Sequence, residues 1–224
     1  MVRRAVAVSR RQEERTEEAK ARLREAALEL FAADGYEAAT LAAISLRAGF
    51  SRTLAQYHYP DKSALALELI EDRLRRDNQV ELLACPDDAS AREAWAALMA
   101  HLDSVTRHYG SLHGDTGQSA ARNTAVRGEM AIHAAALMGS DERITRRVDV
   151  LTRDLIARVE RLLEICRRQG MIPADTDVHA MAVLHVHSIW GLALALFANP
   201  WGARRINAAL DQIRVLLEAL RVKG

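Results

Sequence analysis

The sequence predicts an all-α protein, and three observations support this fold class. Hydrophobic residues make up 50% of the 224 residues, and alanine and leucine dominate over the β-branched valine and threonine. The chain has only 4 prolines and 11 glycines, most of them at the ends of apolar segments. Within these segments apolar residues recur at intervals of three and four, as expected for helices with one buried face.

Residues 40–62 are expected to form two short helices, joined by a tight turn and followed by a third helix. Thr40 is suited to cap the first helix, because its hydroxyl can accept a hydrogen bond from a free amide. That helix should end at Gly49, since glycine adopts the left-handed conformation without strain. Ser51 is expected to cap a second helix over residues 52–59. These elements form a helix-turn-helix, whose second helix enters the major groove of DNA.

Four short segments in and around this motif follow one another in an order and at a spacing that are informative together. They are AALELFAADGY at 26–36, AGFSR at 48–52, YHY at 57–59 and PDKSAL at 60–65. Together they resemble the tetracycline-repressor (TetR) family of transcriptional regulators over about residues 22–69. The resemblance implies an N-terminal three-helix DNA-binding domain and a larger helical domain for ligand binding and dimerisation. Thr53 and Gln56 depart from the glycine and the aromatic residue common in the family, which affects the expected operator sequence and not the fold.

The expected domain organisation has three parts. Residues 1–15 are an arginine-rich arm, expected to be a flexible, solvated tail or a segment that follows DNA phosphates or enters the minor groove. Residues 16–64 form the helix-turn-helix domain, which begins with a long helix over residues 16–33. Residues 65–224 form the ligand-binding and dimerisation domain. From residue 61 onward, apolar spacing predicts helices over 61–83, 90–109, 119–138, 144–168, 177–197 and 203–222. Asp61 is expected to cap the first of these helices and Ser90 the second.

Two kinds of DNA contact are predicted. The net charge is only +1, so attraction to DNA must come from local groups. Arg52, Thr53 and Gln56 are expected to lie in the major groove, because arginine and glutamine make bidentate contacts with base edges. Phosphate contacts are expected from residues at helix starts and beside the recognition helix: Thr40, Ser51, Tyr57, His58 and Lys62. The expected partner is a double-stranded DNA operator.

The last two predicted helices, over residues 177–197 and 203–222, indicate a homodimer. One is apolar on nearly every side and the other has an apolar stripe, so both need extensive burial. Burial within one subunit would also satisfy them. The resembling family instead pairs these helices across a two-fold axis, and two recognition helices one DNA turn apart would supply specificity. The interface is predicted to include Val183, Ile189, Leu196, Ile206, Leu210, Ile213, Leu217 and Leu220.

A small-molecule effector is the second expected partner. Apolar, aromatic and histidine side chains suited to a mixed cavity are Trp95, Met99, Tyr109, Met130, His133 and Trp190. The alternative is a filled core without a ligand, because methionine and tryptophan at helical spacing are usually core residues. Ligand binding is expected to shift the helix that begins at Asp61 and so release a palindromic operator, as a repressor would.

Other classes of function find no support in the sequence. The eight histidines lack the spacing of a metal site, and no phosphate-binding loop, nucleophile motif or paired carboxylates suggest an enzyme or a cofactor. Cys85 and Cys166 are expected to be reduced core residues. No export signal is visible, and the apolar run at 189–198 covers about half a membrane span, so a cytoplasmic location is expected. The competing hypothesis is a helical protein that binds small molecules or protein partners and has a vestigial helix-turn-helix.

Overall fold

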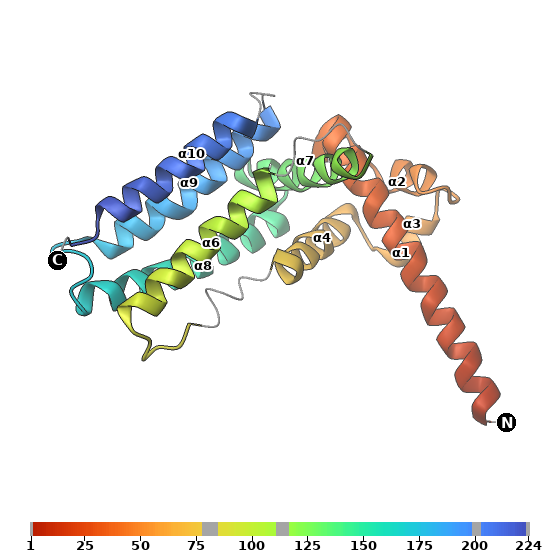
Figure 1. Cartoon of the computed structure of the whole chain (residues 1–224). Coiled ribbons are helices and arrows are strands. Elements are labelled where there is room, and N and C mark those ends of the chain that lie inside the picture. Colours follow the sequence, from red (N-terminus) through yellow and green to blue (C-terminus); the bar gives the residue numbers. More distant parts are fainter. Residues whose placement is uncertain (1, 78–84, 111–116, 199–202, 223–224) are drawn as a thin grey trace. The chain divides into compact units, whose positions relative to one another are not determined.

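The computed structural model describes residues 2–77, 85–110, 117–198 and 203–222. Within these ranges the regular secondary structure is entirely helical and contains no strand, which confirms the predicted all-α fold (Figure 1). The chain divides into two compact units. Unit 1 combines residues 1–71 with 123–145, and unit 2 combines 72–122 with 146–224.

Unit 1 contains the N-terminal helices. They are α1 (Val2–Ala38), α2 (Leu41–Arg47), α3 (Leu54–His58) and the first part of α4 (Lys62–Asp77). The expected helix over residues 16–33 is longer at both ends, and the expected arm at 1–15 is helical from Val2. The reason is local, because this segment is rich in arginine, glutamate and alanine and lacks glycine and proline. Gly35 interrupts α1 with a φ of 82°, close to the predicted helix end.

Most of α7 (Gly117–Leu137) and the start of α8 (Glu142–Arg168) also belong to unit 1. The predicted domain boundary after residue 64 therefore falls within α4, and residues 123–145 group with the helix-turn-helix. Gly128 makes this grouping possible, since a Cβ atom at this position would lie 2.3 Å from the backbone oxygen of Leu28. The backbones of α7 and α1 approach each other as closely as only glycine allows.

The core of unit 1 confirms the apolar stripe predicted for the first long helix. Leu23, Ala27 and Phe31 are fully buried, and Leu30 is 9% exposed. Phe31 also contacts the ring of Tyr36 at a centroid distance of 5.4 Å. These residues form the surface of α1 on which the shorter helices of unit 1 pack.

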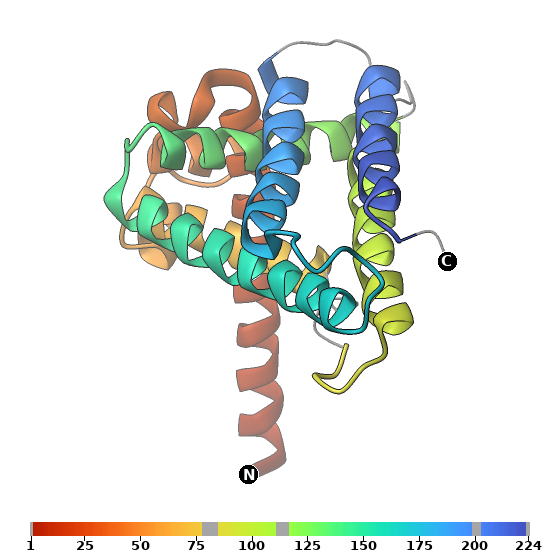
Figure 2. The ribbon, with the colours of Figure 1, turned by 90° about the vertical axis from the view of Figure 1, so that its left-hand side faces the viewer.

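Unit 2 contains α6 (Ala91–Gly110), α9 (Val178–Ala198), α10 (Ala203–Ala219) and most of α8. Helix α10 packs against both α6 and α9 (Figure 1, Figure 2). Ser90 caps α6 as predicted, because its hydroxyl accepts a bond from the Glu93 amide while the Glu93 carboxylate accepts one from the Ser90 amide. The core residues of this unit include Leu98, Leu102, Leu162, Leu163 and Val186.

The two cysteines are free, as predicted, and both are buried. Burial raises the pKa of the Cys166 thiol to about 11, and its Sγ lies 3.6 Å from the Ala91 carbonyl oxygen. Burial also raises the pKa of Cys85. Both thiols are therefore protonated at neutral pH, which makes them poor nucleophiles and poor metal ligands.

Candidate functional site

The turn between α2 and α3 has the predicted geometry at its first half. The Thr40 hydroxyl accepts a hydrogen bond from the Ala43 amide at 3.1 Å, so Thr40 caps α2. Gly49 follows α2 with a φ of 78°. The second half differs from the prediction, since α3 begins at Leu54 and its N-cap is Thr53. The Ser51 hydroxyl lies 3.4 Å from the Thr53 hydroxyl and makes no cap, which corrects the role predicted for Ser51 as a helix cap.

Two contacts that the sequence analysis missed hold α3 in place. The Ser45 hydroxyl on α2 accepts a hydrogen bond from the Ala55 amide at 2.8 Å, and both residues are fully buried. On α1, the Arg22 guanidinium donates to the Ala48 carbonyl at 2.6 Å and lies 4.4 Å from the centre of the Phe50 ring. Helix α3 is thus bonded to α2, and the turn between these two helices is held on α1.

The outer face of α3 is free to meet a partner. Arg52, Thr53 and Gln56 are exposed, and Tyr57 is 83% exposed. A large aromatic side chain at this exposure is unusual for a residue with only a structural role. The opposite face points inward, as the burial of Ala55 shows. The predicted base-contacting residues are therefore all exposed, Arg52 and Thr53 in the turn before α3 and Gln56 on α3.

The residues predicted to contact phosphates lie in different environments. Thr40 and Ser51 are exposed. His58 is half-buried, and its ring meets the Tyr57 ring edge-on, with the ring centroids 5.1 Å apart. Lys62 is different, because its ammonium donates to the carbonyl oxygens of Tyr36 at 2.6 Å and Glu37 at 3.1 Å. The same ammonium lies 4.2 Å from the centre of the Tyr36 ring, and burial lowers its pKa. Lys62 thus connects α4 to the end of α1, and its contact with phosphate remains a prediction.

A partly buried set of polar side chains also connects α1, the end of α3 and α4. Arg24 forms an ion pair with Glu68 at 2.5 Å, and the same carboxylate accepts a hydrogen bond from the Tyr59 hydroxyl at 3.2 Å. Burial, together with the charge of Glu68, raises the pKa of Tyr59, so its hydroxyl remains a donor at all physiological pH values. These contacts fix the C-terminal end of α3 against α4.

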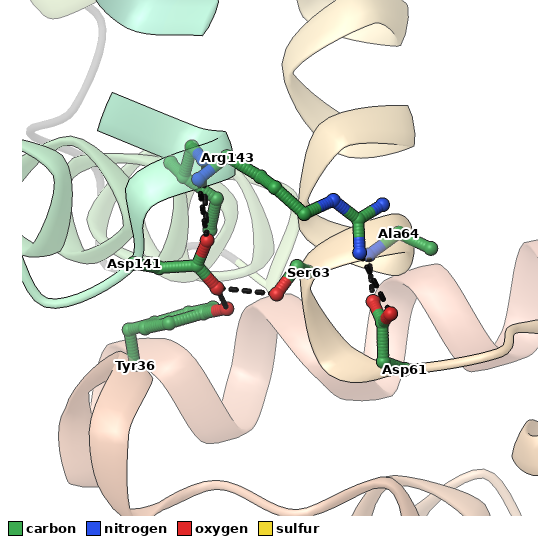
Figure 3. Close-up of polar contacts among 7 residues, drawn as sticks. Tyr36, Asp61, Ser63, Ala64, Asp141 and Arg143 are labelled. Carbon is green, nitrogen blue, oxygen red and sulfur yellow. Dashed lines mark hydrogen bonds and ion pairs between the residues drawn. The ribbon is translucent and has the colours of Figure 1, made fainter. Parts of the chain in front are cut away.

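Asp141, in the corner between α7 and α8, is the polar centre of the rest of unit 1 (Figure 3). Its Oδ2 accepts hydrogen bonds from the Tyr36 hydroxyl, at 2.9 Å, and from the Ser63 hydroxyl. Its Oδ1 accepts bonds from the amides of Arg143 and Ile144, which caps α8. Burial acts to raise the pKa of Asp141, but these hydrogen bonds outweigh it and lower the pKa below 3.8.

A second bond joins the same corner to α4. The Arg143 guanidinium lies 2.7 Å from the carboxylate of Asp61 (Figure 3). Asp61 in turn caps α4 as predicted, since its Oδ1 accepts a hydrogen bond from the Ala64 amide at 2.7 Å. The start of α8 is therefore attached to the end of α1 and to the start of α4, the helix that follows the recognition helix.

We expect Asp141→Ala to lower the free energy of unfolding by about 2 kcal/mol at pH 7, since it removes a helix cap and leaves two hydroxyl donors unpaired. The folded-state pKa is lowered, so this stabilisation is present above the unfolded pKa of about 4 and is lost as the pH falls below it. Urea unfolding of wild type and variant at pH 7 and pH 3 measures both effects. Asp149→Ala, which removes an exposed pair with Arg153, is the control. A difference between Asp141→Ala and wild type that does not shrink at low pH would contradict the assignment.

The predicted effector residues are divided between the units. Met130 and His133 are buried in unit 1, where His133 Nδ1 lies 2.8 Å from the Glu129 carbonyl oxygen. Trp95, Met99 and Trp190 belong to unit 2, and the side chain of Tyr109 lies outside the described residues. The structure thus does not gather the predicted set within either unit.

Trp95 has a structural role within unit 2. Its indole N–H donates to the Glu218 carboxylate at 3.1 Å, and the Arg221 guanidinium lies 5.8 Å from its ring centre. Trp95 is only 5% exposed. It therefore joins α6 to α10, and its place in an effector site remains a prediction.

The sequence analysis missed a pair of buried histidines in unit 2. His101 on α6 and His185 on α9 are 9% and 3% exposed, and their ring centres lie 5.8 Å apart. Burial and the neighbouring His101 lower the pKa of His185 to about 3. The signal in the sequence was the presence of His179, His185 and His187 in an otherwise largely apolar helix. Among the described residues, no group of three or more histidines, cysteines or carboxylates could hold a metal ion.

The predicted interface residues occupy different environments within one chain. Leu210 and Leu217 are each 2% exposed and Ile189 is 8% exposed, so they are core residues of unit 2 and have little surface for a partner. Val183, Ile213 and Leu220 are partly exposed. The side chains of Leu196 and Ile206 lie outside the described residues. The large apolar residues most exposed on α9 and α10 are Leu184 at 57%, Val215 at 55% and Leu216 at 63%.

The apolar character of α9 is also unusual for a helix of a single subunit. Its segment Val178–Ala195 is the one stretch of the described chain that is long and apolar enough to cross a membrane. Only 28% of this segment is buried within the chain. Seven further residues of the segment are partly buried, and Leu184 is its one large apolar residue in the exposed class.

Residues 23–69 match the family model described as bacterial regulatory proteins, tetR family. No curated protein sequence matches the chain. Solved structures similar over nearly the whole chain include a γ-butyrolactone receptor (ArpA-like protein), with 21% identity, a TM-score of 0.65 and coverage of 93% of this chain and 90% of that chain. A SmeT–triclosan complex has 18% identity, a TM-score of 0.68 and 92% coverage of both chains. The MbdR regulator from Azoarcus sp. CIB has 19% identity, a TM-score of 0.66 and coverage of 92% and 100%.

Proposed function

We propose that this chain, which belongs to the TetR family of transcriptional regulators, binds a palindromic DNA operator as a homodimer and releases it when a small molecule binds. The observation that supports the proposal is the exposure of Arg52, in the turn before α3, and of Gln56 and Tyr57 on α3, while Ala55 of the same helix is buried and bonded to Ser45. Exposed arginine and glutamine side chains on a fixed helix and its preceding turn suit direct contact with base edges.

In the proposed complex Arg52, Thr53 and Gln56 contact bases, while Tyr57, His58 and the hydroxyls of Thr40 and Ser51 contact phosphates. The exposed Tyr57 hydroxyl is a hydrogen-bond donor suited to a phosphate oxygen. Lys62 contributes mainly by holding α4 on α1, with its ammonium already bonded to two carbonyl groups. DNA binding then depends on a few exposed side chains and on the order of the turn.

The proposed dimer uses α9 and α10. Leu184, Val215 and Leu216 are more than half exposed, and these exposed apolar side chains on α9 and α10 support an apolar partner surface. A second copy of the chain is the partner that DNA recognition requires, since one short helix contacts only a few base pairs. Insertion of α9 into a membrane is disfavoured by His179 and His187, which are exposed polar residues on the same helix.

The proposed switch acts through α7 and α8. Both helices have residues in unit 1 and in unit 2. In unit 1 they are attached to α1 at Gly128 and, through Asp141 and Arg143, to α1 and α4. A ligand bound in unit 2 that favours a different position of α7 or α8 would thereby change the spacing of the two recognition helices. A 100-fold loss of operator affinity requires about 2.7 kcal/mol of coupling.

An effector is further supported by two similar structures, a γ-butyrolactone receptor and a SmeT–triclosan complex. The competing hypothesis, a helical binding protein with a vestigial helix-turn-helix, is disfavoured by the exposed side chains at α3. A vestigial motif would have no reason to keep Arg52, Gln56 and Tyr57 exposed where Ser45 holds α3 and Arg22 holds the turn before it.

The proposal is tested through the specificity of DNA binding. We expect Gln56→Ala to change the preferred base at one position of each half-site, at a cost of about 1–3 kcal/mol for the original operator. Selection of bound sequences from random DNA, with wild type and variant in parallel, measures the change. The matched control is Gln12→Ala, an exposed glutamine near the start of α1, which should leave the preferred sequence unchanged. An unaltered preference in Gln56→Ala would remove Gln56 from the base contacts.

A further inference from the structure

The histidine pair in unit 2 lies in an unusual environment for polar side chains. His185 is 97% buried on α9, where the neighbouring positions on its face, Ala182, Val186 and Ile189, are all apolar and buried. Neither nitrogen of His185 has a hydrogen-bond partner among the residues that the structure describes. A buried polar group without a partner destabilises the folded chain, so a protein keeps one only where something else supplies the bond.

The ring of His101 on α6 lies beside that of His185, with centres 5.8 Å apart and planes inclined by 53°. The two imidazoles come from different helices, so the pair marks a place where α6 and α9 face each other inside unit 2. Burial, with the contribution of His101, lowers the pKa of His185 from 6.5 to about 3. At neutral pH His185 therefore has one N–H donor and one nitrogen acceptor and no charge.

We propose that the His101–His185 pair is the polar end of the effector site and binds the hydroxyl group, alcoholic or phenolic, of a largely apolar molecule. This inference rests on the proposed function, because it names the chemical class of the effector. A hydroxyl group both donates and accepts, so it can give its proton to the acceptor nitrogen of one imidazole and accept the N–H of the other. The apolar residues around His185 suit the remainder of such a ligand.

Other ligand classes match this chemistry less well. A carboxylate or phosphate would require a cationic partner, which a neutral imidazole with a lowered pKa does not provide. A purely apolar ligand would leave both nitrogens of His185 without a bond. A metal ion would need further ligands, and the described residues contain no group of three that could hold one.

The test uses three probes of similar shape on the full-length protein: 1-naphthol, 1-methylnaphthalene and 1-naphthoate. Isothermal titration should show 1-naphthol binding at least about tenfold more tightly than 1-methylnaphthalene, because only the hydroxyl satisfies the imidazoles. It should show 1-naphthoate binding more weakly than 1-naphthol. In the wild-type protein with ¹⁵N-labelled histidine, 1-naphthol should shift the imidazole resonances of His185, and 1-methylnaphthalene should not.

Substitutions of the two histidines test whether they cause the preference for 1-naphthol. His185→Phe keeps a ring of similar size and removes both nitrogens, so the preference for 1-naphthol over 1-methylnaphthalene should disappear. His185→Gln and His101→Phe provide the same test if His185→Phe does not fold. The control is His179→Phe, which changes an exposed histidine of the same helix that pairs with Glu160, and it should retain the preference.

Three results would overturn the inference: equal affinity of the wild type for 1-naphthol and 1-methylnaphthalene, tighter binding of 1-naphthoate, or no binding of any probe at about 1 mM. A preference that persists in the folded His185 variants would overturn it as well. Operator binding by the ligand-free protein is measured separately. If the protein binds its operator but none of the three probes, only this inference is contradicted. If it binds no DNA, the proposed function is contradicted instead.

Discussion

Gly128→Ala should destabilise the protein by at least about 3 kcal/mol, although alanine is the better helix former by about 1 kcal/mol. A Cβ atom at this position would lie 2.3 Å from the Leu28 oxygen and 2.8 Å from the Leu28 Cα. The obstructing atoms belong to the backbone of α1, so no rotation of a side chain can relieve the overlap. The helices α7 and α1 must separate, and the buried contacts between them are lost.

Gly191→Ala is the matched control for this substitution. Gly191 lies in α9, is exposed, and has no other atom within 4 Å of the position of an added Cβ. Since α9 belongs to the proposed dimer interface, both glycine variants are compared in a monomeric Leu216→Glu background. There the gain in helix propensity is unopposed, and Gly191→Ala should be as stable as its parent or slightly more stable. Chemical denaturation followed by circular dichroism measures both variants. A Gly128→Ala protein at least as stable as wild type would mean that α7 does not pack on α1 as described.

Leu216→Glu should convert the proposed dimer to monomers and lower the affinity for a palindromic operator at least about 100-fold. In one subunit Leu216 is 63% exposed, so a glutamate there meets water and leaves the fold of the chain intact. In the dimer the same carboxylate would be buried against apolar surface. Leu210→Glu is a less informative variant, because Leu210 is a core residue and its replacement would disrupt unit 2 itself.

The control for the dimer is Val150→Glu, at a 47% exposed position on α8. It introduces the same charge outside the proposed interface and should leave both assembly and DNA binding unchanged. Sedimentation velocity gives the assembly state, and a gel shift gives the operator affinity. A Leu216→Glu protein that remains dimeric would exclude this face of α10 from the interface.

The order and type of the helices followed from local signals in the sequence. The cap at Thr40, the turn at Gly49 and the cap at Asp61 each depend on a few adjacent residues, and the structure confirms all three. Helix ends were less predictable. Residues 52 and 53 make a turn that precedes the α-helix, and the segment before Thr16 continues the helix because nothing in it interrupts one.

Contacts between distant segments could not be predicted from spacing. The docking of α7 on α1 depends on Gly128 and Leu28, which are separated by 100 residues of chain, and nothing near Gly128 in the sequence indicates its neighbour. The bonds of Asp141 to Tyr36 and Ser63 have the same long-range origin. For this reason the predicted domain boundary at residue 64 does not coincide with the boundary between the compact units.

Because contacts between distant segments cannot be read from spacing, the residues predicted for the effector site do not lie together in one unit. Trp95 and Met130 have the composition of cavity residues, yet each is buried in a different unit, and Trp95 is bonded to Glu218. His101 and His185 were the more informative residues. They lie on helices far apart in the sequence, and only the fold places one ring beside the other.

The central claim is that two copies of α3 contact one DNA duplex in the major groove. Selection of sequences from a random DNA pool by the full-length wild-type protein, with the stoichiometry of the complex determined on the selected DNA, tests it most directly. The proposed function predicts an enriched palindrome, with half-site centres one helical turn of about 10 base pairs, or a multiple of it, apart. It also predicts an even number of chains on each site. Recovery of no preferred sequence, or of a single unrepeated site occupied by one chain, would contradict it.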